Sequence, residues 1–365
     1  MSSNPGGIES FLMNYIKKSN STQVRFDFLN TLGTSLAYSK EIKEMGNKII
    51  NLKLVDGKKH HIKYREQVDY FFNENAAKYD CIWFNLVNLN SLLWIRKAKK
   101  YHIPRIIVHA HNSAIMTPGI RGIKQSIKHT FNRKIVTYYA TDLWACSSLA
   151  GQWFFGNNKF RIIKNAINVD DFKFNRSKRK KIRKQMNISN DTFVIGNVGR
   201  LQYQKNQQFA LKILETYITH NSNTRLIFVG KGDDLVYLKN IVRERQLTKY
   251  VYFVGKQNDI QAWLSAFDLF LFPSRFEGFP IAGLEAEANG LPILAAGDGI
   301  PKELKLNDNL EFLYLKDSVD LWCKKIDSLS RNKRINPLKI KKEFMNKNYD
   351  LDSVHKNWGE ISNLK

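Results

Sequence analysis

Short apolar runs alternate with longer helix-like segments along the whole chain. In the first half the predicted strands are 24–29, 48–54, 81–86, 106–110, 143–146 and 161–163. In the second half they are 193–198, 226–229, 251–254, 269–272, 293–295 and 312–315. Strands separated by about ten to fifteen helical residues are typical of βαβ units and parallel sheets. Two such series predict an α/β protein with two doubly wound domains.

The boundary between the two series is also visible. Residues 165–171 are rich in turn formers, a basic stretch at 176–184 predicts a solvent-exposed helix, and a new strand starts at Phe193. We therefore place one domain at 1–170 and a second at 171–348. The tail, 349–365, is expected to form a last helix capped by Asp352 or Ser353, because Asp and Ser are favoured at helix starts.

One predicted helix, 120–139, carries an apolar stripe between basic residues. The stripe is Ile120, Ile123, Ile127, Phe131 and Ile135, at three- and four-residue steps. A basic amphipathic helix can lie on an anionic membrane. The same stripe can instead pack on a sheet and leave the charged face in water. We favour the packed interpretation.

Composition and charge narrow the class of protein. The chain has 365 residues, 43% hydrophobic content and a net charge of +25. Such a charge attracts nucleic acid, anionic membranes or phosphate-bearing ligands, although a host with a basic coding bias would also produce it. No apolar run reaches the roughly 18 residues of a membrane span, and the first residues lack the apolar core of a signal peptide. Three separated cysteines, Cys81, Cys146 and Cys323, fit free thiols in a reducing compartment.

The most informative segment runs from Phe272 to Glu285. A strand is expected to end at Pro273, and a helix to begin near Pro280, since proline is favoured in the first helical turn. Free amides at a helix start bind anions. Glu277 and Glu285 flank this loop, so amides for phosphate and carboxylates for hydroxyls would meet at one strand end. This set of groups suits a nucleotide sugar.

Two further groups of polar residues follow predicted strands. Arg200 and Lys205 come after the strand 193–198, where loops line the ligand crevice of open sheets, and the two cations suit a diphosphate. His109 and His111 close the strand 106–110 and, two residues apart, should share a face. A zinc site would lack a third ligand nearby. We favour His111 as the functional histidine because it lies farther past the strand.

Glu277 and Glu285, with seven residues between them, resemble the E-x7-E motif of the GT4-like retaining glycosyltransferases of the GT-B fold. Other segments are similar to that family: the Gly6-Gly7 loop, Gly199-Arg200-Leu201 with Lys205, His109-Ala-His111-Asn112, and the Ile300-Pro-Lys-Glu303 segment known from capsule and exopolysaccharide enzymes. The resemblance covers nearly the whole chain. One departure is that no strand precedes Gly6, so we expect the family's first strand to be missing or to lie upstream.

The resemblance implies two Rossmann-like domains facing a central cleft, with the acceptor on the first domain, the donor on the second and the last helix crossing back. It implies a metal-independent, retaining hexosyl transfer from a nucleotide-diphosphate sugar to a polyprenyl-diphosphate-linked saccharide, in capsule, exopolysaccharide or O-antigen assembly. The protein would need no cofactor and would be cytoplasmic, peripheral on the inner face of the cell membrane. The implied catalytic residues are Glu277, His111, Arg200 and Lys205. The implied donor-binding residues are Gly6, Gly7, Arg200, Lys205, Glu277, Gly278, Phe279, Pro280, Ile281 and Glu285.

Two other classes of protein are consistent with part of the pattern. Net charge alone suggests a nucleic-acid-binding protein, but no RNA- or DNA-binding motif accompanies it. A nicotinamide-dependent oxidoreductase would share the sheet type, but Gly230-Lys-Gly232 has Leu235 in place of the third glycine of the dinucleotide fingerprint. Asp350-Leu-Asp352 matches a metal-binding D-x-D in letters only, because it sits at the start of the last predicted helix, where Asp is a normal cap.

Overall fold

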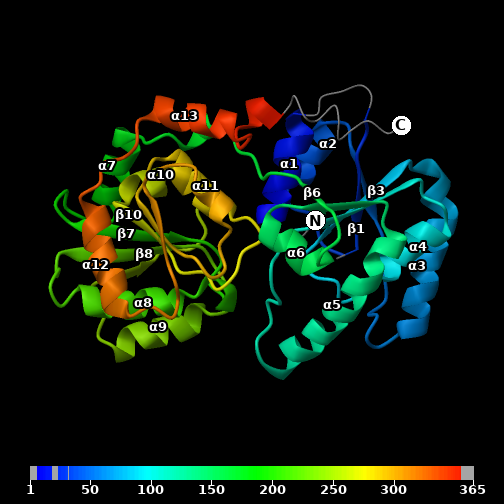
Figure 1. The fold of residues 1–365 in the computed structure, drawn as a ribbon, viewed down its shortest axis with the longest axis horizontal. Helices are drawn as coiled ribbons and strands as arrows, with labels where there is room; N and C mark the ends of the chain where they lie inside the picture. Colours follow the sequence, from blue (N-terminus) through cyan, green and yellow to red (C-terminus); the bar gives the residue numbers. More distant parts are fainter. Residues whose placement is uncertain (1–5, 19–23, 32, 355–365) are drawn as a thin grey trace. The chain divides into compact units, whose positions relative to one another are not determined.

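The computed structural model describes residues 6–18, 24–31 and 33–354. These fall into two compact units, 1–166 with 351–365 and 167–350, of which only the described residues are discussed (Figure 1). The sequence placed the division at 170. Each unit is described by itself below.

The first unit contains two parallel sheets with helices between the strands. Strands β1 and β2 form a pair, and the other four form a sheet of order β3-β4-β5-β6 (Figure 1). The strands are β1 (Asp27–Asn30), β2 (Lys48–Asn51), β3 (Cys81–Leu86), β4 (Arg105–Ala110), β5 (Asp142–Ala145) and β6 (Arg161–Ile162). The helices are α1 (Gly7–Lys18), α2 (Ser39–Glu44), α3 (His61–Asn75), α4 (Leu93–Lys100), α5 (Gly119–Tyr139) and α6 (Ser148–Phe155).

The second unit is one six-stranded parallel sheet of order β12-β11-β10-β7-β8-β9. Its strands are β7 (Phe193–Val198), β8 (Thr224–Val229), β9 (Val251–Phe253), β10 (Leu269–Phe272), β11 (Ile293–Ala296) and β12 (Leu310–Leu313). Its helices are α7 (Arg176–Gln185), α8 (Gln207–Tyr217), α9 (Leu235–Glu244), α10 (Ile260–Ala266), α11 (Ile281–Ala288), α12 (Val319–Ser330) and α13 (Pro337–Asn346). This is the Rossmann strand order, in which the direction of winding reverses between β7 and β10. The carboxyl ends of those two strands are therefore where a ligand site is expected.

All twelve predicted strands are strands in the structure, and β3, β7 and β10 have the predicted bounds. β10 and β11 are buried at every position, which explains why they are continuous apolar runs and not alternating ones. The predicted α/β class with parallel sheets is confirmed.

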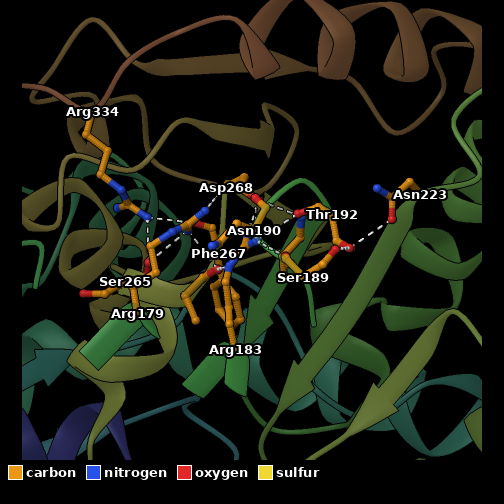
Figure 2. Close-up of polar contacts among 12 residues, drawn as sticks. Arg179, Arg183, Ser189, Asn190, Thr192, Asn223, Ser265, Phe267, Asp268 and Arg334 are labelled. Atoms are coloured by element: carbon orange, nitrogen blue, oxygen red, sulfur yellow. Dashed lines mark hydrogen bonds and ion pairs between the residues drawn. The ribbon is translucent and has the colours of Figure 1, made fainter. Parts of the chain in front are cut away.

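The basic helix α7 is not simply solvent-exposed, as the sequence predicted. Arg183 has a side chain that is 2% exposed, and it forms an ion pair with Asp268 at 2.5 Å (Figure 2). Arg179 binds the other carboxylate oxygen at 2.7 Å, and both arginines donate to backbone carbonyls around Ala266. Asp268 also accepts the amide of Val194, so α7 is fastened to the amino ends of β7 and β10. The prediction failed because arginine spacing does not reveal which guanidinium groups find buried acceptors.

The packed interpretation of helix 120–139 is wrong. Four of the five stripe residues are exposed on α5: Ile120 (75%), Ile123 (62%), Ile127 (65%) and Phe131 (64%). The buried residues of the helix are Gly122, His129 and Val136, on the opposite face. A period of 3.6 defines a stripe but does not say whether the stripe faces inward.

The predicted N-cap residues of the last helix, Asp352 and Ser353, are also wrong. Asp352 and Ser353 lie inside the helical segment 351–354, so neither precedes it, and 355–365 lie outside the described residues. Asp350 is fully buried, accepts from Lys341 at 2.9 Å and stands in a parallel bridge with Ile167. It is therefore a buried structural acid that directly precedes the helical segment, at the helix start where the sequence placed it. At the other end α1 is the first described element, and any strand before Gly6 would lie outside the described residues.

Candidate functional site

The loops that follow β7 and β10 meet through a buried ion pair. Lys205 ends a short 3-10 turn, Tyr203–Lys205, after β7, and Glu277 lies in the loop after β10. The ammonium of Lys205 is 2.7 Å from Oε1 of Glu277, and the two side chains are 14% and 6% exposed. The predicted lysine and the first glutamate of the motif are thus in direct contact at the expected edge of the sheet.

Hydrogen bonds from neighbouring residues fix the positions of these two loops relative to each other. Gln204 donates to the carbonyl of Phe276 at 3.0 Å and to Oε2 of Glu277 at 3.4 Å. The Arg275 amide donates to the Gln204 carbonyl at 2.8 Å. The amide of Glu277 donates to the carbonyl of Gly299 at 2.7 Å. Glu277 therefore has a fixed backbone, which positions its carboxylate before any ligand arrives.

Arg200 lies one residue past Gly199 in the loop after β7 and is exposed. Its carbonyl accepts from Gln207 at 3.0 Å, but its guanidinium makes no hydrogen bond or ion pair with another described residue. A guanidinium left free at the switch point can bind an anion without breaking a protein contact. The structure does not join Arg200 to the Lys205–Glu277 pair through any side-chain contact among the residues it describes.

The second glutamate of the motif, Glu285, lies on α11 and is half-buried. Burial raises the pKa of its carboxyl group to about 8, and it has no hydrogen-bonding partner among the described residues. Glu287 provides a contrast on the same helix. Burial also raises the pKa of Glu287 to about 8, but this carboxylate accepts from the Asn307 amide and is 2% exposed. Glu287 is therefore a structural acid, whereas Glu285 has acceptor capacity left for a ligand.

Helix α11 begins at Ile281, with Pro280 as its N-cap residue. Proline has no N–H, so Pro280 cannot donate to an anion, and the amide donors of this predicted set are those of Gly278, Phe279 and Ile281. The Phe279 ring is 5% exposed and stacks on Tyr349 at a centroid distance of 5.0 Å. Its side chain is part of the core, so Phe279 can serve a ligand only through its backbone.

Gly230 and Gly232, which do not complete a dinucleotide fingerprint, are needed where the loops after β7 and β8 touch. A Cβ on Gly230 would lie 1.9 Å from the Gly199 carbonyl oxygen, and a Cβ on Gly232 would lie 2.1 Å from that of Leu201. The Leu201 amide donates to the Lys231 carbonyl at 3.1 Å across the same contact. Gly230-Lys-Gly232 is thus a packing feature that shapes the loop carrying Arg200. Its position directly after a strand was the signal available from the sequence.

In the first unit, His109 and His111 share a face of β4, as predicted, with ring centroids 4.0 Å apart. His109 is fully buried among Phe11, Trp83 and Trp144. His111 is half-buried, and its Nε2 lies 2.8 Å from Oδ1 of Asn85. Burial lowers the pKa of His111 to about 3, so the ring is neutral at physiological pH. With Oδ1 as acceptor, Nε2 carries the proton and Nδ1 is an acceptor.

Gly6 and Gly7 open the first unit at the start of α1. The Gly6 amide donates to the Glu9 carboxylate at 3.1 Å, which closes the first turn of the helix. Gly7 is exposed, and a Cβ there would meet nothing within 4 Å. The two glycines leave backbone accessible at a helix start.

Other kinds of site find little support in the described part of the chain. It contains no group of three or more His, Cys, Asp or Glu side chains arranged to hold a metal ion. Its three cysteines are free, and burial raises the pKa of Cys81 and of Cys323 to about 11, which keeps both thiols protonated. None of its helices combines the length and the apolar character that a membrane span requires.

Comparison with known proteins finds a related family for the second unit and a shared fold for the chain. Residues 178–348 match the family described as glycosyl transferases group 1. This match lies within the second unit, which is therefore similar to the group 1 glycosyltransferases. The full chain also has the GT-B fold: it superposes on Anabaena HepE, solved with UDP and glucose, with a TM-score of 0.75 at 18% identity, covering 99% of this chain and 97% of HepE. WaaG, a glycosyltransferase involved in lipopolysaccharide biosynthesis, gives a TM-score of 0.73 at 15% identity, over 99% of this chain and 98% of WaaG.

Three relatives with sequence similarity carry glycosyltransferase names. EpsF of Bacillus subtilis (strain 168), named as a glycosyltransferase, is 25% identical over 99% of this chain and 93% of its own length. An Escherichia coli enzyme named UDP-Gal:alpha-D-GlcNAc-diphosphoundecaprenol alpha-1,3-galactosyltransferase is 30% identical over 49% of this chain. The O-antigen biosynthesis glycosyltransferase WclY of Escherichia coli is 31% identical over 43%. The chain matches about half of the length of these two Escherichia coli proteins, 47% and 42%.

Proposed function

We propose that this protein is a metal-independent, retaining glycosyltransferase that moves a sugar from a nucleotide-diphosphate sugar to a polyprenyl-diphosphate-linked saccharide during assembly of a surface polysaccharide. The observation that carries the proposal is the Lys205–Glu277 pair at the carboxyl ends of β7 and β10, inside the group 1 domain. Support for the donor class comes from HepE, solved with UDP-glucose. Support for the acceptor class comes from the galactosyltransferase relative, whose name specifies a diphosphoundecaprenol-linked acceptor.

In this proposal the second unit holds the donor. Glu285 accepts from the ribose hydroxyls, because its carboxylate has no partner among the described residues. Arg200 and Lys205 bind the diphosphate, together with backbone amides at the start of α11. Glu277 contacts hydroxyls of the donor sugar and stabilises positive charge on the ring. The bond from the anomeric carbon to the diphosphate breaks, and the leaving group carries away both electrons of that bond.

The acceptor binds the first unit, with His111 near the reacting hydroxyl. The acceptor oxygen forms the new bond on the face from which the diphosphate leaves, and the hydroxyl proton passes to a leaving phosphate oxygen. A neutral His111 with Nδ1 as acceptor can orient that hydroxyl without holding a charge. A lipid-linked acceptor also requires the protein to work at the inner face of the cell membrane.

The test begins with a thermal-shift panel of nucleotide-diphosphate sugars, followed by transfer assays with the strongest stabiliser and a polyprenyl-diphosphate saccharide. Removing one donor to developing charge commonly costs about 10²–10³ in rate. We therefore expect Arg200→Ala, Lys205→Ala and Glu277→Ala each to lower kcat by about that factor, while Lys212→Ala, an exposed cation on α8, leaves it unchanged.

Two further readouts test the finer points. NMR of the product should show that the anomeric configuration of the donor is kept, and transfer should continue at an undiminished rate in excess EDTA. Near-normal transfer by all three site variants would show that the site is elsewhere. Tight, strongly salt-dependent RNA binding without stabilisation by any nucleotide sugar would support the nucleic-acid-binding alternative, and stabilisation by NAD alone would support an oxidoreductase.

A further inference from the structure

Helix α5 turns an apolar stripe to solvent. Its exposed members recur at three-, four- and seven-residue steps, so they form one line along the helix: Ile120, Ile123, Ile127, Phe131 and Tyr138, each at least 62% exposed. The line runs over 19 residues, from 120 to 138, and the 18 steps between them span about 27 Å of helix. An exposed line of large apolar side chains marks a surface that binds another molecule or a membrane.

The opposite face of the helix is fastened by hydrogen bonds and close packing. The buried ring of His129 accepts the Leu89 amide at 3.0 Å on Nδ1 and lies 3.0 Å from the Trp153 carbonyl on Nε2. Asn132 donates to the Leu89 carbonyl at 2.5 Å, and Val136 is fully buried. Figure 1 shows α5 between α4 and α6, the helices it packs against. These contacts fix the rotation of α5, so its apolar line cannot turn inward without losing them.

The charges on α5 are of one sign. The helix carries five Lys or Arg residues and no Asp or Glu, and four of the five are exposed: Arg121, Lys124, Lys128 and Lys134. Helix α3 differs, although it also exposes two large apolar side chains, Ile62 (73%) and Tyr70 (69%). Its charges are mixed, with two cations and three carboxylates. Of these two helices, only α5 combines an apolar line with a purely basic border.

We infer that the exposed face of α5 docks on an anionic lipid bilayer. In the docked state the helix lies in the plane of the membrane, with its apolar side chains at the boundary between headgroups and acyl chains and its cations on the lipid phosphates. The inference rests on the proposed function, because docking would bring the acceptor-binding unit to the membrane that holds a polyprenyl-linked substrate.

The charges on α5 argue against a second copy of this chain or a nucleic acid as the binding partner of this face. A symmetric contact between two copies would bring the same basic borders together with no carboxylate on either helix. A nucleic acid would satisfy the cations but would leave the isoleucine line against a phosphate backbone. A bilayer with anionic headgroups satisfies both the apolar line and its border.

The test measures co-sedimentation with vesicles of phosphatidylcholine containing about 30% phosphatidylglycerol, and with pure phosphatidylcholine vesicles. We expect binding that needs the anionic lipid and weakens with salt. Ile127→Gln with Phe131→Gln should lower the partition coefficient at least tenfold, because two large side chains no longer leave water. Lys124→Gln with Lys128→Gln should lower it by about five-fold for each cation at low salt. The matched control, Ile62→Gln with Tyr70→Gln on α3, should stay within twofold.

Several outcomes would overturn the inference. The first is that the unaltered protein does not bind vesicles at low salt. The second is that the α5 variants bind vesicles as well as the unaltered protein does. The third is that the protein forms a dimer which the double substitution Ile127→Gln, Phe131→Gln dissociates while vesicle binding persists. All of the changed side chains are exposed, and unfolding temperatures check that every variant is folded. Stabilisation by the donor reports on the second unit independently. Intact donor stabilisation with no vesicle binding would defeat only the docking surface, whereas vesicle binding without any donor stabilisation would defeat only the proposed function.

Discussion

The two glutamates of α11 allow a pH experiment with an internal control. Burial raises the pKa of both Glu285 and Glu287 to about 8, yet only Glu287 is held by a neighbouring side chain, Asn307. If Glu285 accepts from two ribose hydroxyls, the ionised form is the one that binds, since a protonated carboxyl has given up part of its acceptor capacity. Donor affinity should then follow the ionisation of Glu285.

The magnitude follows from that pKa. With a pKa of about 8, about 1% of Glu285 is ionised at pH 6 and about 50% at pH 8. Donor affinity should therefore rise with pH, by up to about fifty-fold over this interval. A nucleotide-diphosphate sugar is the right probe, because its diphosphate is already fully ionised and adds no titration of its own.

The assay is isothermal titration calorimetry with the strongest donor from the panel, at pH 6, 7 and 8 in buffers of different ionisation enthalpy. The unaltered protein should release about one proton on binding at pH 6. Glu285→Gln should bind weakly with little dependence on pH, and Glu287→Gln should keep the full dependence. A pH-independent affinity in the unaltered protein, or the same slope in Glu285→Gln, would refute the assignment of Glu285 to the ribose.

Two stability predictions follow from contacts described above. Asp268→Ala should lower the free energy of unfolding by about 3–5 kcal/mol in urea denaturation, because it leaves the buried Arg183 guanidinium without its carboxylate. The control Asp308→Ala, at an exposed pair with Lys339, should change it by less than about 1 kcal/mol. A loss below about 1 kcal/mol for Asp268→Ala would show that the arginine cluster around Asp268 is not formed. Gly230→Ala should lower both the unfolding temperature and donor stabilisation, because the new methyl group would meet the Gly199 carbonyl at 1.9 Å; unchanged donor stabilisation would mean that this loop contact does not shape the site.

The sheet of the second unit could be predicted from the sequence because its information is local. Phe193–Val198 is a mostly apolar run followed by Gly199, and Leu269–Phe272 is an apolar run followed by Pro273. Buried parallel strands have this pattern. The Lys205–Glu277 contact could be anticipated only because both residues follow strands that a Rossmann order places side by side. The sequence pattern does not give the distance between the two side chains, so only the structure shows that Lys205 and Glu277 form an ion pair at 2.7 Å.

The errors have a common physical origin. The pattern at 120–139 gave the periodicity of α5 correctly but not its rotation, which polar contacts of His129 and Asn132 decide. The basic run at 176–184 likewise hid a buried residue, Arg183, two of whose partners, Ala266 and Asp268, lie 83 and 85 residues away in sequence. Hydrogen bonds between distant segments leave no periodic trace, so burial of polar side chains is the part of the fold least accessible from sequence.

The separation of Lys205 and Glu277 along the chain has a consequence for how the protein matures. The two residues are 72 positions apart, and each lies in the loop after a different central strand. Contacts between distant segments form late, since a long loop must close before they stabilise anything. A newly made chain therefore acquires this ion pair only after β7 and β10 lie side by side, and a nascent chain that has not yet released residue 277 from the ribosome has no such site at all.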